Sequence, residues 1–151
     1  MVDPIAIAGS GMTAQARRLA AGADNIANAR STGALPGTAA GAGAAGAGAA
    51  AAGADAPRPY APVSSGQAAV TGPDGQGMGT RAVFRATQPA FVPEFSPDSP
   101  FADGDGMVAA PNVDLVGETV AMTQGLDAYK ANLRVFEAAD ELTREALNLT
   151  A

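Results

Sequence analysis

The chain has 151 residues, a formal net charge of −6, a pI near 4.4, and neither histidine nor cysteine. These features exclude Ser-His-Asp and Cys-His nucleophile systems, imidazole or thiolate metal sites and disulfides, and they argue against a nucleic-acid partner. Alanine supplies 38 residues, whereas Leu, Ile, Val and Phe together supply only 26, about 17% of the chain. Because this share is below that of a well-cored globule, we expect no compact self-sufficient core.

An N-terminal helix is predicted over residues 3–31, within a first segment of residues 1–32. Asp3 is suited to cap it, and Pro4 falls at the first helical position, where its missing N–H costs nothing. Large and small side chains each recur every seven residues, as two columns of a heptad pattern: Ile5, Met12, Leu19 and Ile26 in one, and Val2, Gly9, Ala16 and Ala23 in the other. The small column would allow a partner helix to approach closely. An ordinary bundle helix and a coiled coil with a distant partner both fit this pattern.

Residues 33–66 are predicted to be a flexible insertion rich in Ala, Gly and Pro. Within Gly33–Ala56, 20 of 24 residues are Ala or Gly, which is a low-complexity composition. The uncharged stretch Ala34–Ala54 has one large apolar side chain, Leu35, so we do not expect it to enter a membrane.

A small β hairpin or ribbon is predicted over residues 67–110. The strand candidates are short: Gln67–Val70, Thr80–Thr87, Ala90–Phe95 and Met107–Ala109. Thr71–Gly75 has the Pro-Asp-Gly composition of a tight connection between the first two strands.

A long C-terminal helix is predicted within residues 111–151, beginning after the capping residue Asn112. Its apolar side chains again repeat in heptads: Leu115, Met122, Tyr129 and Phe136, with Thr119, Leu126 and Leu133 in the second column. Asp140 interrupts that column, and the stripe then shifts to Val135, Leu142, Ala146 and Leu149. The helix would be about 54 Å long, which suits a rod better than a compact domain.

The two ends of the chain differ in charge. Residues 1–31 carry a balance of +1, and residues 112–151 carry seven acidic and three basic residues, a balance of −4. Opposite signs favour a heteromeric contact between these ends over like-with-like association.

Two acidic clusters are candidates for sites of chemistry. Asp98–Gly106 lacks the ligands of a calcium loop and is interpreted as a solvated turn. Asp140, Glu141 and Glu145 share an exposed helix surface, with nothing to desolvate them, and are interpreted as surface charge. We therefore expect no catalytic residue, no cofactor, no metal and no small-molecule substrate.

Both ends of the chain resemble bacterial flagellar basal-body rod proteins. The similar segments are Ile7–Met12, Ala14-Gln15 and Ala23–Ala29 at the start, and Pro111–Glu118, Tyr129, Ala131-Asn132, Val135 and Leu147–Leu149 at the end. In the middle, Val70–Gln76, Val83-Phe84 and Phe95–Gly106 resemble the proximal rod subunit of that family. The resemblance covers roughly residues 1–32 and 67–151, and the Ala/Gly tract departs from it.

The resemblance implies a mainly α fold in which the two terminal helices pair as a coiled coil around a small β insertion. It also implies a structural subunit of the helical drive shaft that transmits motor torque, exported by the flagellar type III apparatus without a cleaved signal peptide. Its partners would be copies of itself and other rod proteins. Another axial protein of the flagellum, such as a different rod subunit or the hook, and a non-flagellar coiled-coil adaptor are the alternatives. The expected interface consists of large heptad residues: Ile5, Met12, Leu19, Ile26, Leu115, Met122, Leu126, Tyr129, Leu133 and Phe136.

Overall fold

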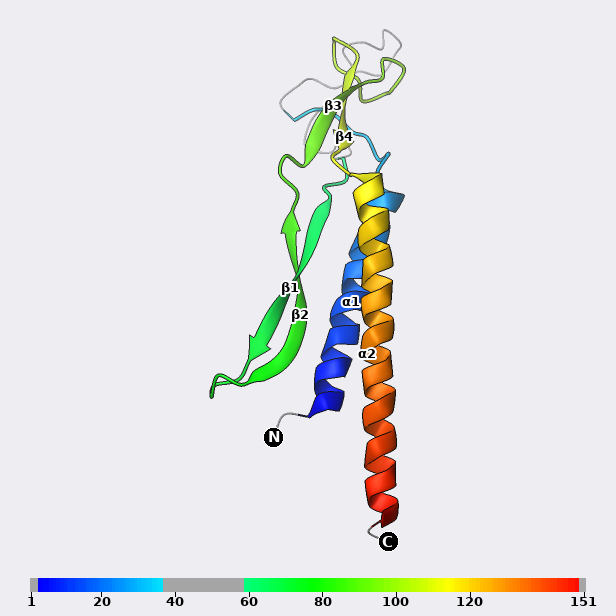
Figure 1. Cartoon of the computed structure of the whole chain (residues 1–151). Coiled ribbons are helices and arrows are strands. Elements are labelled where there is room, and N and C mark those ends of the chain that lie inside the picture. The colour runs from blue at the N-terminus through cyan, green and yellow to red at the C-terminus, as the bar shows by residue number, and fades with distance from the viewer. Residues whose placement is uncertain (1–2, 37–58, 150–151) are drawn as a thin grey trace. The chain divides into compact units, whose positions relative to one another are not determined.

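The computed structural model describes residues 3–36 and 59–149 (Figure 1). Within these ranges the chain is mixed α/β, with two helices and two small antiparallel sheets. The elements in chain order are α1 (Pro4–Ala27), β1 (Val63–Thr71), β2 (Gly77–Ala86), β3 (Phe91–Phe95), β4 (Met107–Pro111) and α2 (Leu115–Leu149). Most of the predicted Ala/Gly insertion, residues 37–58, lies outside the described residues.

The contacts divide the chain into two compact units, the first assembled from three segments of the sequence and the second from two. The first unit contains residues 3–23, 64–85 and 116–149, and the second contains residues 24–36, 59–63 and 86–115. Each unit therefore combines parts of the chain that are far apart in sequence.

The helices lie where the heptad patterns place them, but several boundaries differ from the prediction. The strands β1 and β2 begin four and three residues before their predicted starts, at Val63 and Gly77. The helix α2 begins at Leu115, so the prediction that Asn112 caps it is wrong, and the amide of Asn112 bonds to the carbonyl of Pro89 instead. The Asp3 carboxylate accepts a hydrogen bond from the backbone N–H of Ile5 at 2.9 Å, which confirms the predicted N-terminal cap. The helix α1 ends at Ala27, four residues before the predicted end, and turns follow it. The strand β1 begins at Val63, inside the segment predicted to be an insertion, because its first residue is held by a distant side chain described below.

In the first unit, α1 and α2 pack against each other in opposite directions. Glycines mark the close approach, since a Cβ built on Gly11 would lie 2.7 Å from Nδ2 of Asn132. Residues meet in reverse order along the two helices: Gly11 with Asn132, Leu19 with Gly125, and Gly22 with Met122. Gly11 and Gly22 weaken α1 by about 1 kcal/mol each relative to alanine, and the close contact with α2 explains why glycine stands at these positions.

The strands β1 and β2 form a two-stranded sheet in the same unit. Their connection is a tight turn, as predicted: the N–H of Gly72 donates to the carbonyl of Gln76 at 2.8 Å, and Gly75 has a φ of 77°. The sheet contacts α1 where the N–H of Thr80 donates to Oγ of Ser10 at 3.1 Å.

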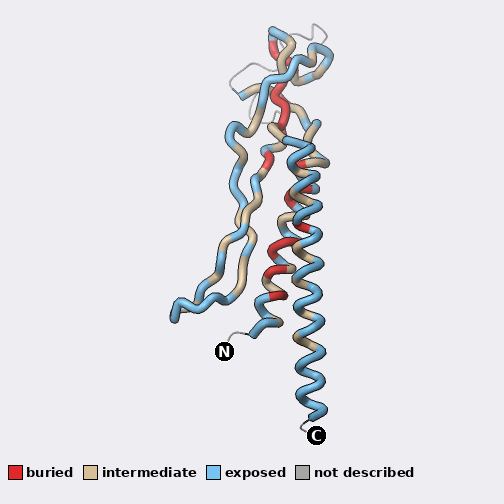
Figure 2. The backbone as a smooth tube through the Cα atoms, in the orientation of Figure 1, coloured by how far each residue is buried: buried red, intermediate tan, exposed pale blue. Residues whose placement is uncertain are grey.

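In the second unit, β4 lies between two partners. It pairs antiparallel with β3, in a register that runs from Phe91 opposite Pro111 to Phe95 opposite Met107. On its other edge, Ala109 exchanges two backbone hydrogen bonds with Gly33, of 2.9 and 3.0 Å. The central residues of β4 are among the most buried in the described chain (Figure 2).

The amide of Asn25, on the last turn of α1, fastens the beginning of β1. Its Nδ2 donates to the carbonyl of Val63 at 2.8 Å, and its Oδ1 accepts from the N–H of Val63 at 3.1 Å and from the hydroxyl of Tyr60 at 3.0 Å. Asn25 is almost completely buried. The Asn25 side chain thus makes the hydrogen bonds to the backbone of Val63 that a neighbouring strand would otherwise make.

The segment Asp98–Gly106 is a turn, but the prediction that it is solvated is wrong for Asp103. This aspartate is buried, and its Oδ1 accepts backbone N–H groups from Asp105 at 3.0 Å and Met107 at 2.9 Å. Buried polar atoms need such partners, so the carboxylate shapes the turn that leads into β4.

Neither metal sites nor membrane spans are found among residues 3–36 and 59–149. No group of three or more acidic side chains in these ranges could hold a metal ion. Neither α1 nor α2 combines the length and apolar character that crossing a bilayer requires. The stretch Ala34–Ala54 lies mostly outside these ranges.

Candidate subunit interface

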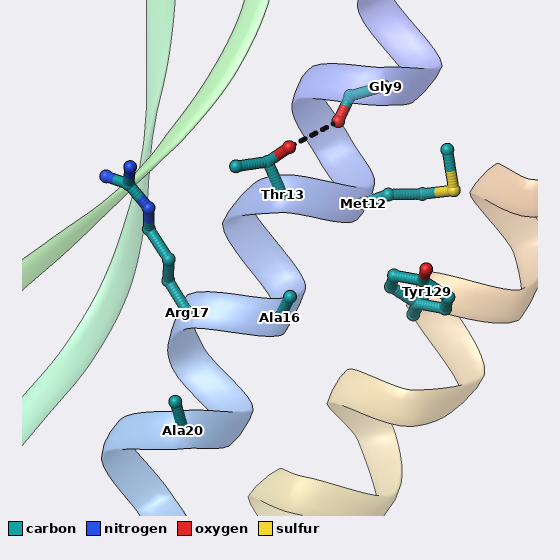
Figure 3. A pocket seen from close by; sticks show the side chains of 7 residues that line it. All are labelled: Gly9, Met12, Thr13, Ala16, Arg17, Ala20 and Tyr129. Carbon is teal, nitrogen blue, oxygen red and sulfur yellow. Dashed lines mark hydrogen bonds between the residues drawn. The ribbon is translucent and has the colours of Figure 1, made fainter.

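An open groove of about 590 Å³ runs beside α1 in the first unit (Figure 3). Six of its lining residues come from α1 and one from α2: Gly9, Met12, Thr13, Ala16, Arg17, Ala20 and Tyr129. Met12 and Tyr129 extend from the two helices toward each other, and Arg17 stands at the opposite rim (Figure 3). The lining is mainly small and apolar. We call this feature the α1–α2 groove.

The small side chains of α1 lie on more than one face of the helix. Gly11 and Gly22 face α2, whereas a Cβ built on Gly9 would meet nothing within 4 Å. Gly9 and Ala16, two members of the predicted small column, line the groove instead. The part of the heptad pattern that permits close helix approach is therefore left open in the single chain.

The predicted interface residues are distributed between the two helices with different degrees of burial. Leu19 and Met122 contact glycines of the opposite helix, and Met12 and Tyr129 line the groove. Half-buried positions are Ile5, Met12, Leu19, Ile26, Met122, Tyr129 and Phe136, and exposed ones are Leu115, Leu126 and Leu133. Ile26 and Leu115 belong to the second unit and the others to the first.

The apolar surface continues along α2 beyond the groove. Leu126 lies three residues before Tyr129 and Leu133 four residues after it, a spacing that places all three on adjoining parts of one helix face. Leu126 is 44% exposed and Leu133 37% exposed. Large apolar side chains are thus exposed next to the apolar groove, which makes this face a candidate contact surface.

The last ten residues of α2 extend past the beginning of α1. Continuing the observed pairing of the helices places Pro4 opposite residues 139–140, so residues 140–149 lie beyond the start of α1 (Figure 1). We call residues 140–149 the α2 extension. Its leucines are strongly exposed, with Leu142 at 67% and Leu149 at 84%.

Charged groups surround these apolar surfaces. On α2, Arg144 pairs with Asp140 at 2.9 Å and Lys130 with Asp127 at 3.8 Å, all of them well exposed. Such pairs contribute little to stability. Neither Arg17 at the groove nor Glu145 on the extension forms an ion pair with another described residue.

Several groove residues were not singled out by the sequence. Thr13, Arg17 and Ala20 belong to neither heptad column, and they line the groove because it lies beside the predicted seam. In the sequence they are marked only by being small or positively charged and by lying three or four residues from Gly9, Ala16 or one another. That signal does not distinguish this face of α1 from the others.

Comparison with known proteins matches both ends of the chain to flagellar families. The family described as "Flagella basal body rod protein" matches residues 5–34, and "Flagellar basal body rod FlgEFG protein C-terminal" matches residues 105–149. The first region covers all of α1 except Pro4, and the second contains the whole of α2.

Curated relatives match nearly the whole length of the chain. The flagellar basal-body rod protein FlgC of Agrobacterium fabrum is 34% identical over 98% of this chain and 96% of its own length. FlgC of Salmonella typhimurium is 32% identical, and FlgC of Escherichia coli O6:H1 is 31% identical, each over 95% of this chain and 92% of its own length. This chain belongs to the FlgC family. It is a structural rod subunit of the flagellar basal body.

Within this FlgC-family chain, residues that carry the family resemblance have structural roles in the second unit. Asn25 holds the start of β1, and Asn112 donates from Nδ2 to the carbonyl of Pro89 at 2.9 Å. Asp103 shapes the turn before β4. These polar side chains position the strands, whereas large apolar side chains of α1 and α2 are exposed in the single chain.

Proposed function

We propose that this chain is a subunit of the proximal rod, where it assembles into the helical shaft that transmits motor torque. The observation that carries the proposal is the similarity to FlgC proteins over nearly the full length of both chains. The role is mechanical and requires no catalytic group. Neither the hook nor a non-flagellar adaptor has comparable support, because the matches span the β region as well as the two terminal helices.

The physical properties of the first unit suit such a role. Two antiparallel helices in close contact form a stiff element. The faces that do not meet the other helix carry apolar side chains that are exposed to water in the single chain. Repeated contacts between different surfaces of identical subunits generate an open helical array. A shaft can be built from subunits of this kind.

The subunit interface is proposed to consist of the ten heptad residues named from the sequence. Some of them also face the opposite helix of the same chain, as Leu19 and Met122 do. We propose that the exposed members, such as Leu126 and Leu133, are covered by copies of this chain or by other rod proteins. Coiled-coil pairing of the terminal helices is part of the same proposal.

Export and location follow from the proposed place in the rod. The chain would leave the cytoplasm through the flagellar type III apparatus without a cleaved signal peptide, and would occupy the periplasmic part of the basal body. An export route of this kind requires an unfolded chain. A subunit with a small core and weak helices meets that requirement.

The test is a deletion of the gene followed by electron microscopy of basal bodies. We expect cells without flagella that still assemble the membrane ring, with swimming restored by the wild-type gene. The chain should also be detected in purified hook–basal bodies of the complemented strain. A deletion strain with complete, rotating flagella would contradict the proposal.

A further inference from the structure

We propose that the α1–α2 groove binds the α2 extension of a second copy of this chain. The inference rests on the proposed function, because it names the partner that a rod subunit would place on this surface. Both surfaces belong to the first unit, and they lie at different positions along it.

The groove is suited to a helix by shape and length. Gly9 leaves open space above the backbone of α1, and Ala16 and Ala20 add only methyl groups, so another helix could approach closely. From Gly9 to Ala20 the groove follows about 17 Å of helix, and the extension of residues 140–149 is about 15 Å long. The two surfaces therefore match in length.

The α2 extension presents the apolar face that such a groove requires. Leu142, Ala146 and Leu149 are spaced by four and three residues, which puts them on one face of the helix. All three are exposed. This stripe is shifted around the helix from the face that carries Met122 and Gly125 toward α1, so it does not simply continue the intrachain contact.

Charge favours the same arrangement. Arg17 stands at the rim of the groove, and Glu145 immediately precedes Ala146 on the extension. Neither forms an ion pair with another described residue of its own chain. Over the longer segments, residues 1–31 carry +1 and residues 112–151 carry −4. Complementary charges select this pairing over groove against groove or extension against extension.

The extension cannot fill the groove of its own chain. Thr13 in the groove lies opposite residues near 130 of α2, and Ala146 is about 24 Å further along the helix. An α2 extension bound in the groove must therefore come from another copy. Because the two surfaces differ, the contact is heterologous, and its repetition extends an array from copy to copy.

Engineered cysteines provide the test, since the chain contains none of its own. A chain carrying Thr13→Cys and Ala146→Cys is expressed in the deletion strain, and its hook–basal bodies are purified, oxidised and run on a non-reducing gel. We expect dimers and higher multimers linked through these two positions. The matched control pairs Thr13→Cys with Asn148→Cys, which points to another side of the extension, and should give no multimers.

The outcomes separate this inference from the proposed function. Incorporation of the chain without multimers, or equal multimers in the control, overturns the contact while leaving the rod assignment intact. Absence of the wild-type chain from hook–basal bodies contradicts the rod assignment itself. A photo-reactive residue at Thr13 that links to a different protein shows that another occupant fills the groove and overturns the choice of a second copy.

A charge exchange tests the ionic part separately. Arg17→Glu and Glu145→Arg should each reduce swimming in the complemented strain, and the double variant should swim better than either single one. A double variant no better than the worse single one overturns the pairing of Arg17 with Glu145. Secreted amounts of each variant, measured by immunoblot, exclude failure of export as the cause.

Discussion

Single polar side chains organise the second unit. Asn25 satisfies both backbone groups of Val63 and the hydroxyl of Tyr60 at once, and it does so in a buried position. Removing one member of such a network leaves buried donors and acceptors with no hydrogen-bond partner. Each such group destabilises the folded chain by about 1–3 kcal/mol. The unit therefore depends on one amide for the link between the end of α1 and the start of β1.

The substitution Asn25→Ala is expected to reduce assembly strongly. It removes the hydrogen bonds to both backbone groups of Val63 and to the hydroxyl of Tyr60, and should destabilise the second unit by about 2 kcal/mol or more. Asn28→Ala is the control, because that side chain donates to the carbonyl of Asp24 one turn away in an exposed position. Hook–basal bodies counted by electron microscopy should be scarce for the first variant and near normal for the second. Equal counts would show that the network is dispensable.

Gly79 supports a second prediction at this scale. Its φ of 111° is unfavourable for any residue with a Cβ, and a Cβ there would collide with Oγ of Ser10. Gly79→Ala should therefore separate β2 from α1 and weaken the first unit by about 1–3 kcal/mol. Gly77→Ala is a fair control, since a Cβ at that position meets nothing within 4 Å. Limited proteolysis measures the effect, and we expect the Gly79→Ala chain to be cleaved faster than the Gly77→Ala chain. Cleavage of the Gly79→Ala chain at the same rate or more slowly would contradict the prediction.

At the scale of elements, hydrophobic periodicity located the helices and strands, because apolar residues repeat at one spacing along a helix and at another along a strand. It could not predict which face of α1 meets α2. Gly9 and Ala16 offer close approach as well as Gly11 and Gly22 do, and only the folded chain shows that the second pair faces α2. The early start of β1 was likewise missed, because it depends on Asn25, which is remote in sequence.

The exposed apolar face of α2 leads to a prediction about assembly. Leu133→Asp or Phe136→Asp would place a charge in a dry contact between subunits, which costs several kcal/mol for each subunit. Export should continue, because the export signal is expected near the N-terminus, while motility should be lost. Thr123→Asp adds the same charge at an exposed position on another side of α2 and should swim normally.

Swimming halos in soft agar and immunoblots of the culture medium measure the two effects. If the Leu133→Asp and Phe136→Asp strains swim as fast as the wild type, neither side chain is buried on assembly. Loss of the chain from the medium would point instead to a defect before assembly. Normal secretion without swimming is the combination that the proposed interface requires.

At the scale of the whole molecule, the buried core is small. Among the described residues, the largest side chains that are almost fully buried are Val108, Asn25 and Pro62, and most of the other buried apolar residues are alanines, glycines or prolines. Alanine burial contributes little, because the hydrophobic gain is proportional to the area removed from water. Meanwhile large side chains of α2 remain exposed. These exposed side chains contribute little to offsetting the chain entropy of a single copy, and we expect contacts between subunits to bury them.

The isolated chain is therefore expected to be weakly helical in dilute solution and to melt without a sharp transition. Circular dichroism of the purified protein measures both properties. Gly9→Ala should raise the helical signal, because alanine favours the helix by about 1 kcal/mol and its methyl group meets no atom within 4 Å. Gly11→Ala should raise it less, since its Cβ would press on Asn132. A highly helical unmodified chain that melts cooperatively would contradict this prediction. It would show that a single copy covers its own apolar faces and does not need neighbouring subunits to fold.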